Sequence, residues 1–233
     1  MDYMNTQPTF TNKVVIFGSR DLAELAYYYL KTDSDYEVVA FTMNQEYITS
    51  SAFLPQGSNE VFPVIPFEEL HKKYPPSEFL LFAPMTGVKM NKIRKNIYKE
   101  GKSMGYTFIS YISSKATLFN NKIGDNCFIL EDNTIQPFTK IGNNVVLWSG
   151  NHIGHHSIIE DHVFVTSHVV VSGHCHIKER AWLGVNSTIR DNTIVGEGCL
   201  VAMGSLITKN TEDNTFWMGS PAKDQPKKAD EVY

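Results

Sequence analysis

Aliphatic residues recur at every sixth position through the C-terminal half of the chain. Each such position from Ile123 to Ile207 holds Ile, Leu or Val, and a small or modest residue, such as Cys127 or Ser157, typically stands four places later. A six-residue period fits neither an α-helix nor an alternating strand, but it is the period of hexapeptide repeats in a parallel β-helix. We therefore expect residues 113–223 to form a parallel β-helix of about five coils, with three faces per turn and the aliphatic side chains inside.

Residues 13–112 show a different pattern, in which short apolar runs alternate with stretches of helical spacing. The apolar runs at 13–18, 36–42, 78–84 and 107–112 predict buried parallel strands, and helices are expected over 20–31, 67–73 and 90–102. This alternation predicts a small Rossmann-like α/β sheet of four or five strands within a domain spanning residues 1–112. We expect an irregular lead-in over residues 1–11, a surface loop over 45–57 and a charged tail over 224–233 that frays.

Composition narrows the range of partners. The net charge of −4 and the isoelectric point near 6.1 do not favour nucleic acid as the main partner. All three cysteines fall at the small position of the repeat, where we expect compact core residues rather than disulfides. The opening residues lack the apolar segment of a signal peptide, and no apolar stretch is long enough to cross a bilayer. We therefore expect a cytoplasmic protein with no membrane partner.

Seven of the eight histidines lie between residues 152 and 176. Because residues eighteen apart stack on neighbouring coils, His155 is expected beside Gly173, on the outer surface. The missing side chain at Gly173 would leave an open floor and an accessible backbone N–H, a slot suited to a thin chain such as pantetheine. His156 is expected to stack with His174, whereas His168 belongs to another column. We expect three further histidines of this segment, His162, His174 and His176, on the exterior of the coil.

A second candidate site lies where the first strand of the α/β domain ends. Gly18-Ser19-Arg20 follows that strand and precedes a helix, whose N-terminal amides can hold a phosphate. Thr42 and Asn44 end the second strand, beside the same expected crevice. The full GxGxxG pattern is absent and no acidic residue ends the second strand, so a dinucleotide dehydrogenase is not favoured. The domain could instead serve only as a docking platform.

Three short segments join the repeat in pointing to one family: NHIGHHS at 151–157, SHVVVSG at 167–173 and GSPAK at 219–223. From about residue 13 to 223 the chain resembles the bacterial sugar acyltransferases of the left-handed β-helix superfamily. The nearest subgroup contains N-acetyltransferases of nucleotide-linked amino sugars, such as the bacillosamine and perosamine N-acetyltransferases. The resemblance implies left-handed coils, acetyl-CoA as acyl donor, no metal, and a homotrimer with active sites between subunits.

His155 matches the catalytic base of that family. The reaction needs a base because the attacking amine must lose a proton as it joins the thioester carbonyl. A backbone N–H near Gly173 would stabilise the oxyanion, and no covalent enzyme intermediate is required. The acidic residue that often follows the base in the family is His156 here, and the one that often precedes it is Gly154. The residues expected to support or orient His155 are therefore His156, His168, Asn151, Glu131 or a group of a neighbouring subunit.

The resemblance also assigns binding residues. The coenzyme surface matches Gly173, Val185, Ala202 and Gly204, with Pro221 and Lys223 at the adenosine end. The nucleotide of the sugar is expected at Gly18, Ser19, Arg20, Thr42 and Asn44, and Trp148 takes a position near the sugar. Corner glycines and a solvated Lys223 are the structural alternative for the coenzyme surface.

The predicted function is acyl-CoA-dependent N-acylation of a nucleotide-linked deoxyamino sugar, for O-antigen, lipopolysaccharide or other surface-glycan biosynthesis. Sugar O-acetylation is an alternative within the same class. A different class is a zinc hydratase like the γ-type carbonic anhydrases, since three imidazoles and a water make a catalytic zinc site. The histidines that suggest this alternative are His152, His155, His156, His174 and His176. A third possibility is a binding protein that keeps the coil without catalysis.

Overall fold

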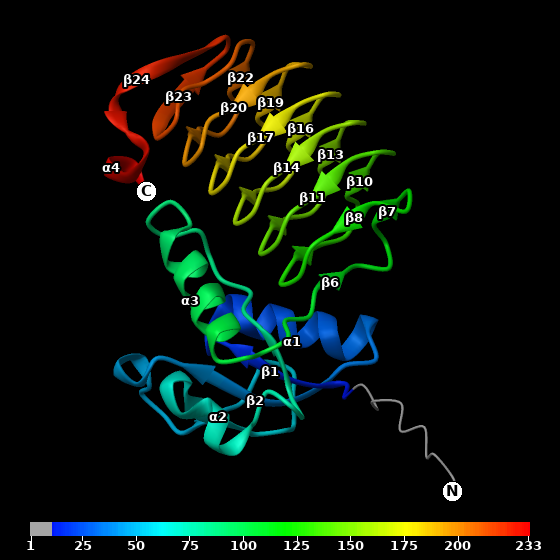
Figure 1. Cartoon of the computed structure of the whole chain (residues 1–233), viewed down its shortest axis with the longest axis vertical. Helices are drawn as coiled ribbons and strands as arrows, with labels where there is room; N and C mark the ends of the chain where they lie inside the picture. The colour runs from blue at the N-terminus through cyan, green and yellow to red at the C-terminus, as the bar shows by residue number, and fades with distance from the viewer. Residues whose placement is uncertain (1–10) are drawn as a thin grey trace, which may run out of the picture.

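The computed structural model describes residues 11–233 and has two parts, an α/β unit and a long coil of parallel strands (Figure 1). Both parts agree with the two sequence patterns. The lead-in expected over residues 1–11 lies outside the described residues except for Thr11. None of the helices in residues 11–233 is both long and apolar enough to span a bilayer.

The α/β unit is built on a five-stranded sheet in the order β3-β4-β2-β1-β5, parallel except for the β3–β4 pair. Helix α1 packs on one face of this sheet, and α2 and α3 pack on the other. The strands are β1 (Lys13–Phe17), β2 (Glu37–Met43), β3 (Ala52–Phe53), β4 (Phe62–Pro66) and β5 (Leu80–Phe82). The helices are α1 (Asp21–Asp33), η1 (Gln45–Tyr47), η2 (Phe67–Glu69), α2 (Leu70–Lys73) and α3 (Lys92–Ser103).

Two differences from the sequence prediction occur in this unit. Strands β3 and β4 were not expected, because prolines at the second and last positions of β4 weaken its strand pattern. The strand expected over 107–112 is split. Phe108 makes only an isolated bridge with Leu81, while Tyr111 and Ile112 form β6 in the coil. The chain therefore enters the coil before residue 113.

The coil has three faces. The first face contains β7 (Thr117–Leu118), β10 (Thr134–Ile135), β13 (His152–Ile153), β16 (Val170–Val171), β19 (Thr188–Ile189) and β22 (Leu206–Ile207). The second face contains β8 (Lys122–Ile123), β11 (Lys140–Ile141), β14 (Ile158–Ile159), β17 (His176–Ile177) and β20 (Ile194–Val195). The third face contains β6 (Tyr111–Ile112), β9 (Phe128–Ile129), β12 (Val146–Leu147), β15 (Phe164–Val165), β18 (Trp182–Leu183), β21 (Leu200–Val201), β23 (Thr215–Gly219) and β24 (Ala222–Lys228).

The aliphatic residues counted in sixes form the interior of the coil, as predicted. Ile135, Ile153, Val171 and Ile189 pair in register on successive turns and are fully buried. The coil has about six turns rather than five. The strands that end at Ile112 and Leu118 keep the six-residue spacing between them. Ile123 follows Leu118 by only five positions, so a count in sixes from Ile123 misses both strands.

From Ile123 to Val201, each turn between faces places one residue in the left-handed region of backbone conformation, three places after the inward aliphatic residue. This position is mostly Asn, Asp, His or Gly, the residues that adopt positive φ most readily. His156, His162, His168 and His174 all occupy it, with φ between 58° and 63°. The concentration of histidines in the sequence is therefore partly a requirement of the backbone.

We name the three edges of the coil by the faces they join. The first corner joins the first and second faces and contains the turn after β13; the second corner joins the second and third faces; the third corner joins the third and first faces. His156 and His174 lie at the first corner, His162 at the second and His168 at the third.

The third face is covered by the α/β unit. Its outward side chains are large and apolar and share one buried cluster with residues of α1 and the sheet: Phe128, Val146, Phe164, Trp182 and Leu200. Arg94 of α3 is 1% exposed and donates hydrogen bonds to the His162 carbonyl (3.0 Å) and to Asn144 Oδ1 (3.1 Å). These contacts fix the α/β unit against the coil.

His162 contradicts the prediction that it lies on the coil exterior. Its side chain is 3% exposed at the second corner, where the Nδ1 atom accepts a hydrogen bond from Asn144 Nδ2 at 2.8 Å. Burial and the nearby Arg94 guanidinium lower the pKa of His162 to about 4. The ring is therefore a neutral part of the junction between the two units.

The C-terminal tail is ordered, in contrast to the fraying expected for residues 224–233. Strand β24 pairs antiparallel with β23, and α4 (Ala229–Val232) follows it with Ala229 buried. Asp230 forms an ion pair with Lys92 of α3 (3.2 Å), and the Tyr233 ring lies 3.9 Å from the Trp182 ring. The tail therefore closes the end of the third face against the α/β unit.

Candidate functional site

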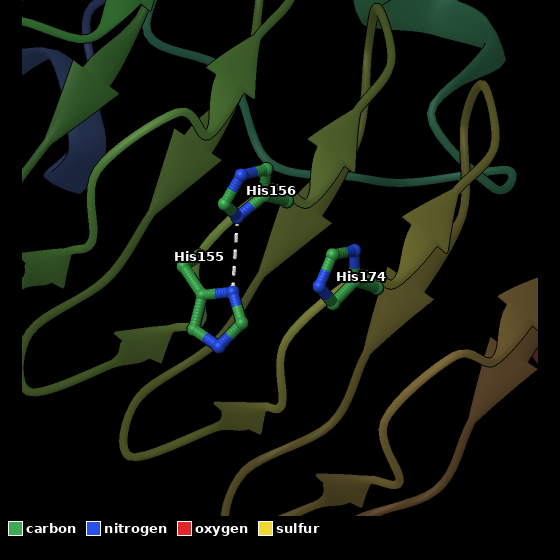
Figure 2. A group of neighbouring side chains, drawn as sticks. All are labelled: His155, His156 and His174. Atoms are coloured by element: carbon green, nitrogen blue, oxygen red, sulfur yellow. Dashed lines mark hydrogen bonds between the residues drawn. The ribbon is translucent and has the colours of Figure 1, made fainter.

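The His155 side chain is exposed at the first corner, in the turn between β13 and β14 (Figure 2). Its backbone N–H donates to Gln136 Oε1 at 2.9 Å, which fixes the turn. Its ring Nδ1 lies 3.1 Å from Nδ1 of His156, within hydrogen-bond distance. One of these two nitrogens must carry the proton and the other must accept it. Among residues 11–233, the hydrogen-bond partner of the His155 ring is therefore His156.

Gly173 lies beside the His155 ring, as the eighteen-residue spacing predicts. A Cβ atom on Gly173 would lie 2.8 Å from both Cε1 and Nε2 of His155, so any side chain there would push the His155 ring out of this position. No hydrogen bond from the Gly173 N–H is found within the described part of the chain. Glycine at 173 thus leaves room for the exposed His155 ring, beside a backbone N–H that has no partner among the described residues.

His174 completes a group of three imidazoles that we call the histidine cluster: His155, His156 and His174. The rings of His156 and His174 stack, with centroids 4.9 Å apart and an interplanar angle of 14°. His155 lies perpendicular to both, at 5.2 and 5.1 Å. One nitrogen from each ring lies within 4.8 Å of the other two, and all three side chains are exposed.

The other residues expected to support His155 lie elsewhere. Asn151 is buried; its Oδ1 accepts from the Val169 N–H at 2.7 Å, and its Nδ2 donates to the Trp148 carbonyl. Glu131 accepts hydrogen bonds from the hydroxyls of Tyr29 and Ser149, both at 2.6 Å. The hydrogen bonds of Asn151 hold it in the coil interior, and those of Glu131 hold it at the third corner. Neither side chain contacts His155.

His168 is also separate from the histidine cluster. It is exposed at the third corner, where a Cβ on Gly150 would lie 2.6 Å from its Nδ1. Trp148 lies in the turn after β12, half-buried against the apolar cluster that joins the coil to the α/β unit. Neither residue is brought to His155 within one chain.

The residues matched to the coenzyme surface divide between two corners. Gly173 lies at the first corner, whereas Val185, Ala202 and Gly204 lie in turns that follow β18 and β21, at the third corner. Pro221 and Lys223 are exposed where β23 turns into β24. A single chain does not bring these groups together.

The α/β unit contains a cavity of about 420 Å³ at the carboxyl ends of β1, β2 and β5. Gly18, Ser19, Arg20 and Asn44 line it, as the motif predicts. Thr42 does not: it is buried, and its hydroxyl donates to the Ile65 carbonyl at 2.8 Å. Met43, which ends the second strand between Thr42 and Asn44, also lines the cavity, and so do residues that the sequence did not indicate, including Tyr47, Pro84 and Thr86. The sequence could have indicated them by position, because each lies within a few residues after the carboxyl end of a central strand.

The repeat and the fold both have known counterparts. Residues 122–154, 138–173 and 174–209 match the family described as bacterial transferase hexapeptide (six repeats). The coil is therefore a hexapeptide-repeat coil of the kind found in bacterial transferases. Among curated protein sequences, none matches this chain significantly.

Several solved structures share the fold over nearly the whole chain. Perosamine N-acetyltransferase from Caulobacter crescentus, in complex with CoA and GDP-perosamine, has a TM-score of 0.81 at 18% identity, covering 92% of this chain and 97% of that one. The acetyltransferase domain of PglB from Neisseria gonorrhoeae, in complex with acetyl coenzyme A, has a TM-score of 0.77 at 21% identity, covering 93% and 100%. WeeI from Acinetobacter baumannii has a TM-score of 0.75 at 18% identity, covering 91% and 99%. The predicted fold, an α/β unit followed by a left-handed β-helix, is confirmed.

Proposed function

We propose that the chain is an acyl-CoA-dependent N-acyltransferase, with acetyl-CoA as donor and the amino group of a nucleotide-linked deoxyamino sugar as acceptor. The observation that carries the proposal is the exposed His155 ring held by His156 beside Gly173. It occurs on a hexapeptide-repeat coil, in a fold shared with proteins whose structures contain CoA or GDP-perosamine. Surface-glycan biosynthesis and a cytoplasmic location are parts of the same proposal.

His155 acts as the general base in this proposal. When its Nδ1–H donates to Nδ1 of His156, the Nε2 atom carries a lone pair and lies on the Gly173 side of the ring. Nε2 takes the proton of the amine as the nitrogen–carbon bond forms at the thioester carbonyl. The same proton then passes to the sulfur as the carbon–sulfur bond breaks. A general base of this kind contributes about 10²–10⁴-fold to a rate.

The Gly173 N–H supplies the complementary charge stabilisation. During the attack, negative charge collects on the carbonyl oxygen, and a fixed backbone donor in a partly dry groove stabilises that charge more than water does. No side chain at 173 blocks the approach of the thioester. The three cysteines are buried, and burial raises the pKa of the Cys127 thiol to about 12, so none of them serves as a nucleophile.

The cavity of the α/β unit would hold the nucleotide of the acceptor. Gly18 and Ser19 line it next to the N-terminus of α1, where unpaired backbone N–H groups attract phosphate. Arg20 adds a positive charge at the same place. Binding the nucleotide there and the coenzyme on the coil would convert an encounter of two substrates into a positioned reaction.

A homotrimer with sites between subunits follows from the division of the coenzyme surface between two corners. A coenzyme that contacts Gly173 at the first corner and Val185 at the third must lie between two copies of the chain. Exposed aliphatic side chains on the uncovered faces, Ile158, Val170 and Ile194, offer apolar surface for that contact.

The test is thiol release from acetyl-CoA with a panel of UDP-, GDP- and dTDP-linked 3- and 4-amino sugars. Wild type is compared with His155→Asn. We expect release with one amino sugar and its loss in the variant. Equal turnover of the variant would contradict the role of His155, and release only with hydroxyl acceptors would replace N-acylation with O-acylation. Silence with every acceptor and every short acyl-CoA would contradict the proposed function.

A further inference from the structure

The spacing of two nitrogens in the histidine cluster is close to that of two ligands on one metal ion. Nδ1 of His155 and Nδ1 of His156 are 3.1 Å apart. Two imidazole nitrogens that bind the same tetrahedral Zn²⁺ at about 2.0–2.1 Å lie roughly 3.3 Å from each other. A metal ion could therefore replace the shared proton with little movement of either ring.

The third ligand is His174. Its ring stacks on His156, its nitrogen lies within 4.8 Å of those of the other two rings, and its side chain is exposed. No hydrogen bond to its ring is found among residues 11–233. The ring is therefore able to turn its nitrogen towards an ion. Three imidazoles with a fourth position open to water form a common zinc donor set, and imidazole also suits Ni²⁺, Cu²⁺ and Co²⁺.

The backbone alone does not account for this group. The left-handed positions 156 and 174 accept Asn as well as His, and the next turn of the same column has Asn192. His155 does not occupy a left-handed position, yet its ring lies against both of the others. Histidine at all three places provides nitrogen ligands where the fold requires none.

We propose that the histidine cluster binds a divalent transition-metal ion, and that the bound ion switches off His155 as a base. The second half of this inference rests on the proposed function. Coordination through Nδ1 of His155 requires its lone pair there, so the neutral ring keeps its proton on Nε2. Nε2 then donates a hydrogen bond and cannot accept the proton of the amine. Removal of the metal restores the base, so the inhibition is reversible.

Metal binding is measured on untagged, chelator-treated protein without substrates. Calorimetric titration with ZnCl₂ and the visible spectrum with CoCl₂ report affinity, stoichiometry and coordination. We expect one ion per chain, and a loss of at least tenfold in affinity for His174→Asn, which keeps a residue suited to the left-handed turn. The control is His71→Asn, an exposed histidine on α2 of the α/β unit, outside the cluster and away from both corners, which should bind as wild type does.

Absence of binding at millimolar free metal would overturn the proposal. So would an equal loss of affinity in His174→Asn and His71→Asn, which would indicate binding to scattered surface histidines. Where acyl transfer is observed, Zn²⁺ should inhibit wild type and His71→Asn but leave His174→Asn at least tenfold less sensitive. Equal sensitivity of His174→Asn would overturn the switching. Because binding is read without substrates, failure of the metal site and failure of the acyltransferase assignment give separate results.

Discussion

The first and second corners use the same residue at the same backbone position for different purposes. His156 and His162 both adopt left-handed φ three places after an inward aliphatic residue. At the first corner His156 is exposed and shares a hydrogen bond with His155. At the second corner His162 is buried beneath Arg94 and accepts from Asn144. The fold thus determines where a histidine can stand, and the covering of the face determines what that histidine does.

The largest expected effect is at the second corner. Arg94→Ala removes the donor to the His162 carbonyl and to Asn144 Oδ1 and leaves a cavity at the junction. We expect unfolding to become easier by about 3–5 kcal/mol, from the unsatisfied acceptors and the lost packing together. Urea unfolding measures this, with Lys99→Ala, an exposed change on the same helix, as control. Equal stability of the two variants would show that Arg94 does not fix the junction.

The next effect is a dependence of stability on pH. The pKa of His162 is lowered to about 4, below its ordinary value, so the unfolded chain binds a proton that the folded chain does not between roughly pH 6.5 and pH 4. His162 therefore reduces stability as the pH falls through that window, by on the order of 3 kcal/mol when the window is crossed.

His162→Asn removes this titration. Asn suits the left-handed turn, and its carbonyl oxygen can accept from Asn144. The loss of urea stability from pH 7 to pH 5 should therefore be smaller in the variant than in wild type. If the free energy of unfolding fell equally in both proteins between pH 7 and pH 5, a group other than His162 would cause the loss of stability in acid.

The smallest effect is expected at the first corner. In Gly173→Ala the added methyl group would collide with the His155 ring, while the backbone angle at 173 places no strain on alanine. We expect kcat/KM for acyl transfer to fall by about 10–100-fold, because the base is displaced from its working position. Urea stability should hardly change, since the ring it displaces is exposed. A variant that loses stability but keeps its activity would reverse this contrast between the corners.

The sequence predicts the inside of the coil better than its outside. The inward column is readable because every sixth residue must be aliphatic wherever the coil continues. Which outward face is covered depends on packing between parts of the chain that are far apart in sequence, so His162 and the tail were misplaced. A signal was present: Phe128, Phe164 and Trp182 recur at multiples of eighteen on the third face, where the first face has Thr134, His152 and Thr188.

The candidate site was predicted as far as arithmetic along the coil reaches. Eighteen-residue spacing correctly placed His155 beside Gly173 and His156 beside His174. It could not assign the orienting partner, because that depends on the rotation of two rings about their side-chain bonds. The motif at Gly18 gave the position of the cavity, but Thr42 turned inward because successive strand residues face opposite sides of the sheet.

The stacked turns of the coil repeat at a constant spacing. Neighbouring parallel strands are about 4.8 Å apart, and the α/β unit is anchored by Arg94 at the level of residues 144 and 162. Each residue on the surface of the coil therefore lies a fixed number of strand spacings along the coil from that anchor. Removal or insertion of one full eighteen-residue turn after residue 174 would move the C-terminal part of the coil by one strand spacing relative to the anchor and the histidine cluster, while keeping every corner in phase. The length of the coil beyond the junction can thus be changed in discrete steps, a degree of freedom that a globular core does not offer.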